Sequence, residues 1–507
     1  MNQQSAIEPP LNLLIVGAGI SGIGMAVHYA RACPGKRFAI LEKRTAIGGT
    51  WDLFRYPGIR SDSDMFTLSF DFHPWTAPDS IAGGESIRGY LEEVIEAHRL
   101  RDHIWLDQAM LAADWDSAAA LWRVTTRTQD GTARAVTARF LYMATGYYDY
   151  ESPHDAAIPG LDRFAGLTIH PQFWPETVDL DGKNVIVVGS GATAVTLVPA
   201  LAERGARVTM LQRTPTWYLN RPRRDRLADL LRRVLPAGLA HRLVRMRNVR
   251  LQDLLFRMAR NRPDNVAEML TGQTRTLLGE AWDERAFTPP YRPWEQRLCL
   301  VPDADFFDAV RSGKASVVTG RIAEVEPDGI RLEDGRHLPA DVIVTATGLR
   351  LSMMGKTAIS IDGEPVDFSQ RWYYRTAMFS NVPNFAALFG YLNASWTLRV
   401  DIVADWLTRL LRQMDAWGAD VVVPHLPADH ALVETFPVDM FSSGYLQRGR
   451  HLFPRCSDAE PWSFGMHYLA DREIMRTAPF DDGVLRFTRA PDATDATAGV
   501  AGAAQLA

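Results

Sequence analysis

Two glycine-rich turns constrain the fold of this chain more than any other feature. The first, Gly17-x-Gly19-x-x-Gly22, follows the apolar segment LNLLIV, and the second, Gly189-x-Gly191-x-x-Ala194, follows KNVIVV. Each turn leads into a helical pattern and then into another apolar strand, RFAILE or RVTMLQR. A strand, a glycine turn, a helix and a strand in this order form the βαβ unit that binds dinucleotides. The sequence therefore predicts an α/β fold with two Rossmann-like dinucleotide-binding domains.

An acidic residue distinguishes the first unit. Glu42 ends the second strand, about 20 residues beyond the turn, where a carboxylate accepts hydrogen bonds from the ribose of an adenosine. Glycines admit the close approach of a pyrophosphate, and the helix N-terminus favours its negative charge. We expect Gly17, Gly19, Gly22 and Glu42 to bind the adenosine diphosphate of a cofactor, although glycine turns that bind nothing also occur.

The second unit carries no such acid. Its second strand ends in Gln212-Arg213-Thr214. A carboxylate there would repel the 2'-phosphate of NADPH, whereas Arg213 can pair with it and the Thr214 hydroxyl can donate to it. The second unit, with Gly189, Gly191 and Ala194, is therefore predicted to bind NADPH. The alternative for Arg213 is an exposed arginine without a ligand.

Composition excludes several classes of function. A net charge of -5 provides no basic field for nucleic acid. The three cysteines, Cys33, Cys299 and Cys456, are too scattered for a disulfide framework, a thiolate metal cluster or a redox pair, and we expect no metal site. The first residues, MNQQSAIEPP, do not resemble a signal peptide, and no apolar run reaches the roughly 18 residues of a spanning helix. We expect a cytoplasmic protein.

Between the two halves of the second unit the sequence changes character. The segment RLADLLRRVLPAGLAHRLVRMRNVRLQDLLFRMARNR is rich in arginine, with leucines at helical spacing. It predicts a helical insertion whose basic face admits a peripheral contact with anionic lipid, although most such faces are solvated or pack on a neighbouring domain.

The order of these features predicts the domain organisation. RFLYMATGYY and ADVIVTATGLR each end in Ala-Thr-Gly, and we interpret them as crossings between domains because glycine lets the chain turn closely. A tail poor in aromatic residues is expected to be disordered. The predicted boundaries are 1–152 and 340–487 for the first nucleotide-binding domain, 153–223 and 290–339 for the second, 224–289 for the insertion and 488–507 for the tail.

Two nucleotide-binding units on one chain suit a flavin that receives hydride from a nicotinamide, because the two rings must meet in one cleft. Enzymes that pass these electrons to a disulfide need a closely spaced cysteine pair, which this sequence lacks. We therefore expect O2 to accept the electrons.

The string Phe164-x-Gly166-x-x-x-His170-x-x-x-Trp174-Pro175 precedes the second unit. It resembles the fingerprint of Baeyer-Villiger monooxygenases, which are class B flavoprotein monooxygenases. Related flavin monooxygenases that act on nitrogen and sulfur carry Tyr or Phe in place of Trp174. The resemblance extends from Leu11 to about Phe487 through GGTWDLFRYPGIRSDSDMFTLSF, RPWEQRLCLVPDADFF and GYLNASWTL. It is greatest to the bacterial subfamily that includes the ethionamide-activating monooxygenase.

The resemblance implies FAD as the cofactor of the first unit and NADPH as that of the second. It implies that Gly48, Gly49, Thr50 and Trp51 line the flavin. Asp62 is expected near the reactive edge of the flavin, where it would orient Arg297. A guanidinium at that place can stabilise a deprotonated flavin peroxide and the adduct that follows.

The resemblance also implies a hinge. We expect His170 to have a structural and conformational role there, together with Phe164, Gly166 and Trp174, and not to transfer protons. Many relatives carry lysine where this chain has Gln296, so Arg213 and Thr214 would supply more of the preference for NADPH.

The implied reaction converts a ketone into an ester or lactone through a flavin C4a-peroxide, with oxidation of sulfides or thioamides as a companion activity. The substrate pocket is expected to draw on the insertion and on the loop from Trp396 to Arg399. One alternative is a flavin N/S-monooxygenase without Baeyer-Villiger activity. Another is a nucleotide-binding regulator without turnover.

Overall fold

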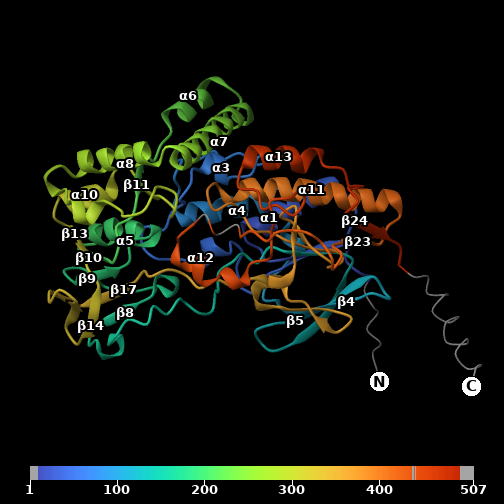
Figure 1. Ribbon diagram of the computed structural model, residues 1–507, viewed down its shortest axis with the longest axis horizontal. Helices are drawn as coiled ribbons and strands as arrows, with labels where there is room; N and C mark the ends of the chain where they lie inside the picture. Colours follow the sequence, from blue (N-terminus) through green and yellow to red (C-terminus); the bar gives the residue numbers. More distant parts are fainter. Residues whose placement is uncertain (1–8, 437–438, 440, 491–507) are drawn as a thin grey trace, which may run out of the picture.

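A computed structural model describes residues 9–436, 439 and 441–490, in which two α/β units lie side by side (Figure 1). The predicted tail lies outside the described residues from residue 491 onward. Its first residue, Thr488, is not disordered, because it ends strand β24 (Leu485–Thr488) and pairs with Val421 of β23 (Val421–Pro424). The α/β class with two Rossmann-like units is confirmed.

The first unit is built on a seven-stranded sheet with the order β20-β21-β22-β7-β1-β2-β3. Strand β1 (Leu13–Val16) pairs in parallel with both β2 (Phe38–Leu41) and β7 (Leu141–Met143). All three strands are fully buried and apolar, as expected for parallel strands covered on both faces. The remaining strands are β3 (Ile104–Trp105), β20 (Tyr373–Tyr374), β21 (Met378–Phe379) and β22 (Phe385–Ala387).

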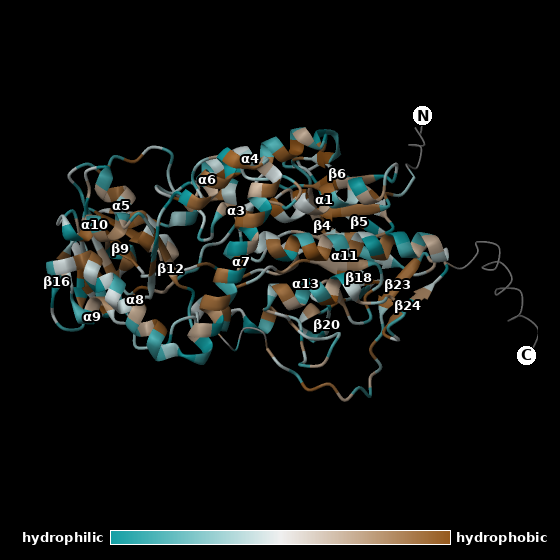
Figure 2. Ribbon diagram, turned by 90° about the horizontal axis from the view of Figure 1, so that it is seen from above, coloured by the Kyte–Doolittle hydropathy of each residue, from teal (hydrophilic) through white to brown (hydrophobic). Residues whose placement is uncertain are grey.

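Helices cover one face of this sheet and a second sheet covers the other. Helices α1 (Ile20–Ala32) and α11 (Trp396–Trp417) pack against each other on the first face. The banding of α11 in Figure 2 shows its apolar and polar sides. The second sheet has the order β19-β18-β4-β5-β6. Its strands are β4 (Ala109–Asp116), β5 (Leu121–Arg127), β6 (Ala133–Ala138), β18 (Ala358–Ile361) and β19 (Glu364–Pro365).

The second unit is a five-stranded parallel sheet with the order β13-β10-β9-β17-β8. Helices α5 (Ala192–Glu203) and α10 (Asp305–Arg311) pack together beside it. The strands are β8 (Leu167–Ile169), β9 (Asn184–Val188), β10 (Arg207–Gln212), β13 (Ala315–Thr319) and β17 (Val342–Thr345). Because β17 pairs with both β9 and β8, this unit extends beyond the boundary predicted at residue 339.

The Ala-Thr-Gly segments lie against the glycine turns. Gly17 has a φ of 108°, and a Cβ atom there would lie 2.6 Å from the Ala144 carbonyl oxygen. Gly189 has a φ of 136°, and its Cβ would lie 2.3 Å from the Ala346 carbonyl oxygen. A side chain at either position would be strained by both the backbone angle and the contact, so glycine is required at the start of each turn.

Two crossing segments connect the units, and they pair with each other. Tyr148 bridges antiparallel to Leu351, and the Asp149 N–H donates to the Arg350 carbonyl over 2.9 Å. The buried Asp149 carboxylate also forms an ion pair of 2.8 Å with Lys356. Burial alone would raise the pKa of Asp149, but the Lys356 ammonium and neighbouring N–H groups outweigh it and lower the pKa. Where the two segments connect the units, they therefore lie antiparallel and are hydrogen-bonded to each other. We call this pair of segments the ribbon.

The arginine-rich segment forms three helices, which together contact both units. Helix α7 (Ala237–Asn261) packs on α3 (Met65–Leu68) and on α6 (Arg226–Val234). Helix α8 (Pro263–Leu278) packs on α10 and on strand β11 (Tyr218–Arg221). None of the helices in the described part of the chain is both long and apolar enough to cross a membrane. The short helix α9 (Glu284–Phe287) completes the insertion.

A buried arginine holds α7 in place. The Arg245 guanidinium donates to the carbonyl oxygens of Phe66, Thr67 and Ser69, and it forms an ion pair of 2.9 Å with Asp401. All of these partners belong to the first unit. One side chain of the insertion therefore binds three backbone carbonyls and one carboxylate of the first unit, and this carboxylate also lies 3.3 Å from His28.

We expect Arg245→Met to loosen this attachment, because it removes the ion pair with the buried Asp401 and the donor to three carbonyl groups. The cost is roughly 3 kcal/mol, so amide hydrogen exchange in α7 should be about a hundredfold faster. The control is Arg250→Met on the same helix, where the arginine is exposed. Equal protection of α7 in both variants would contradict the anchoring role of Arg245.

Candidate active site

Two connected cavities run between the first glycine turn and the second unit. The larger is open to solvent, has a volume of about 1450 Å³ and is lined by both units, from Gly48–Trp51 on one side to Thr193 and Arg297 on the other. The smaller has a volume of about 710 Å³ and extends to Glu42. They share five wall residues, Gly19, Gly49, Ala144, Tyr148 and Tyr150, and so form one elongated passage.

The narrow end of this passage carries the predicted adenosine site. The Glu42 carboxylate is buried and accepts hydrogen bonds from the N–H groups of Ala18 (2.8 Å) and Arg44 (2.9 Å). Burial raises the pKa of Glu42, an effect that these two donors only partly offset. A Cβ atom on Gly22 would lie 1.9 Å from the Gly17 carbonyl oxygen, so the third glycine serves the packing of helix on turn.

The Gly48–Trp51 segment forms the middle of the passage. Gly49 has a φ of 54° and lies against Gly19, so two glycines of distant segments meet there without side chains. Thr50 begins helix α2 (Thr50–Leu53), and its hydroxyl lies 3.2 Å from that of Tyr150. The two glycines leave space for the pyrophosphate of FAD, and the buried Glu42 carboxylate at one end of the passage suits its ribose. No local sequence pattern indicated Tyr150.

Arg297 and Asp62 form an ion pair in the larger cavity. The Arg297 Nη1 atom lies 3.1 Å from the Asp62 Oδ2 atom, and the two side chains are 33% and 43% exposed. Burial alone would lower the pKa of Arg297, but the Asp62 carboxylate, and then the hydroxyls of Tyr147, Tyr445 and Tyr148, outweigh it and raise the pKa. The guanidinium therefore stays protonated. The structure brings together the two residues that the sequence analysis paired, and it adds three tyrosines.

The loop that carries Asp62 is fixed to the rest of the molecule on both sides. Arg60 forms a largely buried ion pair with Asp305 of α10, in the second unit. Asp64 caps helix α3 by accepting from the Thr67 N–H, and the Asn248 side chain of α7 donates to it over 2.8 Å. These contacts were not predicted, because no local pattern marks residues so distant in sequence as partners.

A further cavity meets the passage at the ion pair. It has a volume of about 1700 Å³, lies under helices α6 and α7, and shares Asp62, Ser63, Arg297, Leu300 and Ala394 with the larger cavity. Apolar side chains such as Leu219, Leu255 and Trp294 line part of it, and four further arginines, among them Arg224 and Arg247, also line it. Of the loop expected to line the pocket, Trp396 lines the passage, whereas Arg399 is buried beside Asp471 at 3.3 Å and lines neither the passage nor the cavity under α6 and α7.

The second glycine turn has an open surface. No atom of the described residues lies within 4 Å of a Cβ built on Gly191, and Ala194 is buried beneath the turn. Gln212 is buried and donates to the Ala286 carbonyl over 2.7 Å, so its role is structural. Arg213 is exposed and makes no ion pair with a described residue, and the neighbouring Thr214 carbonyl accepts from Ser190.

The fingerprint segment lies away from the passage and against both domain crossings. A Cβ atom on Gly166 would lie 2.4 Å from the Asp341 carbonyl oxygen, which explains the glycine. The His170 Nδ1 atom accepts from the Gln172 N–H over 3.2 Å, and the Gln172 side chain donates to the Asp149 carbonyl of the first crossing. Burial lowers the pKa of His170, while the backbone of Gly348 in the second crossing opposes the shift.

The two aromatic residues of the fingerprint pack on different clusters. Phe164 contacts the cluster around Val325 and Ile330, and Trp174 contacts the core of the second unit. His170 lines neither the passage nor the cavity under α6 and α7. The conformational role of His170 and Trp174 stays a prediction.

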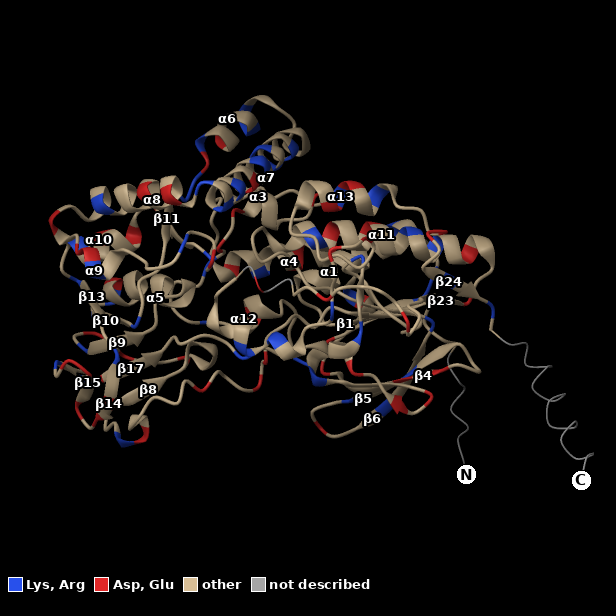
Figure 3. Ribbon diagram, viewed as in Figure 1, with Lys and Arg blue, Asp and Glu red and all other residues tan. Residues whose placement is uncertain are grey.

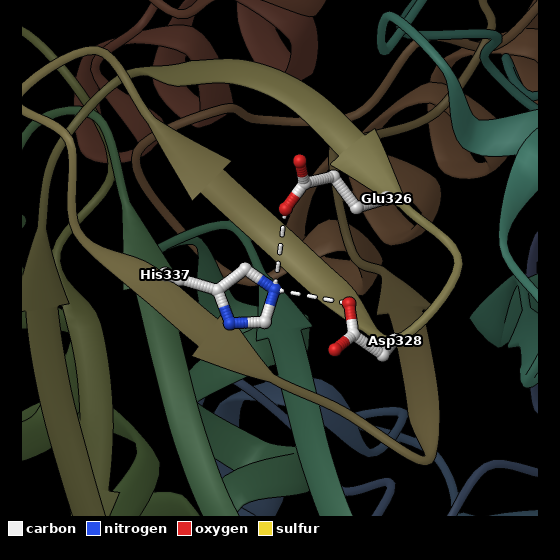
Figure 4. Close-up of side chains that lie close together, drawn as sticks. All are labelled: Glu326, Asp328 and His337. Atoms are coloured by element: carbon white, nitrogen blue, oxygen red, sulfur yellow. Dashed lines mark ion pairs between the residues drawn. The ribbon is translucent and has the colours of Figure 1, made fainter.

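One other group of side chains has the spacing of metal ligands. On strands β14 (Ile322–Glu326), β15 (Gly329–Leu332) and β16 (His337–Pro339), the His337 Nε2 atom lies 3.4 Å from Glu326 and 3.2 Å from Asp328 (Figure 4). Glu326 is also paired with Arg331. Because Glu326 already pairs with Arg331 and the group lies at the surface, we assign no metal site to it.

Comparison with known proteins gives concordant matches. The family model described as pyridine nucleotide-disulphide oxidoreductase matches residues 14–248. The probable FAD-binding monooxygenase AlmA of Acinetobacter baylyi is 44% identical over 490 residues, which cover 96% of this chain and 98% of that protein. The FAD-containing monooxygenase EthA of Mycobacterium tuberculosis is 45% identical over 483 residues, which cover 95% and 98%.

Solved structures share the fold. A cyclohexanone monooxygenase bound to ε-caprolactone has a TM-score of 0.74 at 20% identity, with 94% of this chain and 100% of that chain covered. A steroid monooxygenase bound to NADP has a TM-score of 0.71 at 21% identity, with 95% and 100% covered. All three cysteines of this chain are buried and free, so the dithiol of a disulfide reductase is lacking. The chain therefore belongs to the FAD-containing monooxygenases, a family of class B flavoprotein monooxygenases that use FAD and NADP.

Proposed function

We propose that this enzyme is a Baeyer-Villiger monooxygenase that uses NADPH and O2 to convert ketones into esters or lactones, and that it also oxidises sulfides or thioamides. The observation that carries the proposal is the position of the Arg297–Asp62 ion pair, at the junction between the passage that fits FAD and the apolar cavity under α6 and α7. The resemblance of the fingerprint segment supports it.

Residues of both units would hold the cofactors. Glu42 and the first glycine turn would hold the adenosine part of FAD, and Arg213 would pair with the 2'-phosphate of NADPH. When bound, FAD supplies hydride acceptance from NADPH and the activation of O2.

Arg297 would act on the charge that develops during oxygen transfer. Its raised pKa keeps the guanidinium protonated, so it can stabilise a negatively charged oxygen at the reacting carbon without accepting or losing a proton. Asp62 would hold the guanidinium in the cavity. The apolar walls that include Leu255 and Trp294 exclude water and suit an apolar ketone or sulfide, whose oxidised atom would lie near Arg297.

The main alternative is a flavin monooxygenase that acts on nitrogen and sulfur without Baeyer-Villiger activity. Trp174 and Arg297 argue against it, since related enzymes of that kind carry Tyr or Phe at the position of Trp174. Product analysis with a simple ketone separates the two, because only the Baeyer-Villiger enzyme forms an ester.

We expect Arg297→Ala to lower the rate of ester formation by about a hundredfold to a thousandfold, as for the loss of a donor to a developing oxyanion. Arg297→Lys should retain part of the rate, because the charge remains but its geometry changes. Ester is measured by gas chromatography and NADPH consumption by absorbance.

The matched control is Arg292→Ala, since Arg292 is exposed and lies only five residues away. Ester formation at the wild-type rate in Arg297→Ala would exclude the proposed role. A parallel loss in Arg292→Ala would point to a general disturbance of the segment.

Arg213→Ala tests the coenzyme site. Loss of a charge-assisted contact to the 2'-phosphate costs about 1.5–3 kcal/mol, so the KM for NADPH should rise by about tenfold to a hundredfold, with the KM for NADH nearly unchanged. Arg207→Ala, at the other end of β10 and also exposed, is the control. Equal changes for both coenzymes would show that Arg213 does not contact the 2'-phosphate.

A further inference from the structure

Exposed apolar side chains are concentrated on two helices. Of the 16 large hydrophobic residues that are exposed in the described part of the chain, nine lie on α6 and α7, among them Leu230, Val234, Leu239, Met246, Leu254 and Met258. Scattered apolar residues are normal on protein surfaces, whereas a gathering of this kind marks an interaction site. The apolar ridge is the name that we give to these nine residues, Leu227, Leu230, Val234, Leu239, Leu243, Met246, Leu251, Leu254 and Met258. Helices α6 and α7 form the part of the molecule that projects upward in Figure 1.

The buried face of α7 fixes the direction of the ridge. Arg245, Asn248 and Ala259 are buried on one side of the helix, where Arg245 is bound to Asp401. Leu239, Leu243 and Met246 are exposed on the opposite side. The inner face of α7 therefore packs on the first unit, whereas the apolar side chains of its outer face are exposed.

Positive charge surrounds the ridge. The segment 221–278 contains 14 arginines and five acidic residues, and Figure 3 shows the arginines along α6 and α7. Several of them are exposed and form no ion pair with a described residue: Arg226, Arg233, Arg242, Arg250 and Arg260. Apolar side chains that project between unpaired arginines complement an anionic lipid surface, where the former enter the acyl boundary and the latter meet headgroup phosphates.

The ridge also borders the mouth of the apolar cavity. Leu227 of α6 and Leu251 of α7 belong to the ridge, and both line the cavity that leads to Arg297. Arg224 and Arg226 lie at the same edge. A lipid surface in contact with the ridge would therefore face the entrance through which substrate reaches Arg297.

We propose that the apolar ridge docks this enzyme peripherally on anionic lipid bilayers and that the cavity takes up lipophilic substrate directly from the bilayer. Only the second part, the nature of the substrate, rests on the proposed function. Docking itself requires neither FAD chemistry nor turnover.

The test is co-sedimentation of the full-length holoenzyme with vesicles. We expect binding to vesicles of phosphatidylcholine with phosphatidylglycerol, weak binding to phosphatidylcholine alone, and loss of binding as salt shortens the Debye length to about 3 Å at 1 M. Val234→Glu should weaken binding by about tenfold or more, because it removes apolar contact and adds repulsion. Arg233→Glu and Arg242→Glu should each weaken it by about fivefold or more.

The matched control is Val433→Glu, since Val433 is 75% exposed and Val234 67% exposed, yet Val433 lies outside the insertion. Equal binding to both kinds of vesicle, no binding to either, or an equal loss in Val433→Glu would overturn the proposal. So would sedimentation velocity that shows a dimer dissolved by Val234→Glu, because a second copy would then cover the ridge.

Turnover of a short, water-soluble ketone separates this inference from the proposed function. Val234→Glu should leave that turnover unchanged and lower only the turnover of a long-chain ketone presented in anionic vesicles. If the wild type binds vesicles but forms no ester from either ketone, docking stands and the Baeyer-Villiger assignment fails. If it forms ester from both and Val234→Glu has no effect in vesicles, uptake from the bilayer is wrong.

Discussion

The ion pair between Arg297 and Asp62 depends on three parts of the molecule at once. Arg297 precedes strand β12 (Cys299–Pro302) of the second unit, and Asp62 lies on a loop of the first. That loop is tied to the second unit by Arg60 and to the insertion by Asp64. A displacement of either unit or of α7 would therefore move Asp62 or Arg297 through direct contacts. The position of the Arg297 guanidinium thus depends on how these three parts are assembled.

The two domain crossings lie side by side and contact the fingerprint segment. The first crossing is bound by Gln172 and the second lies against His170, so the fingerprint segment contacts both strands of the ribbon. Its glycine, Gly166, is required by the close approach of the Asp341 carbonyl. We propose that this segment shapes the connection between the two units, which would explain why a family fingerprint lies outside the passage.

Local chemistry explains which features the sequence could predict. Glycine turns, the acid at Glu42 and the arginine at Arg213 follow from the order of residues within one βαβ unit, and resemblance alone indicated that Arg297 and Asp62 would pair. The ion pair of Arg60 with Asp305, the contact of Asp64 with Asn248 and the tyrosines around Arg297 join segments far apart in the chain. Their residue types also fit exposed surface positions, so only the assembled fold distinguishes them. The same applies to Arg399, which ends the segment expected to line the pocket and which is buried beside Asp471.

A permanently charged guanidinium lies between the passage that we propose for FAD and the cavity that we propose for an apolar substrate. The most direct measurement is mass spectrometry of the product formed from a cyclic ketone by the wild-type enzyme with NADPH under heavy-isotope O2. The account predicts a lactone that carries one heavy oxygen atom per molecule. Unchanged ketone, with NADPH consumed and hydrogen peroxide released, would contradict it.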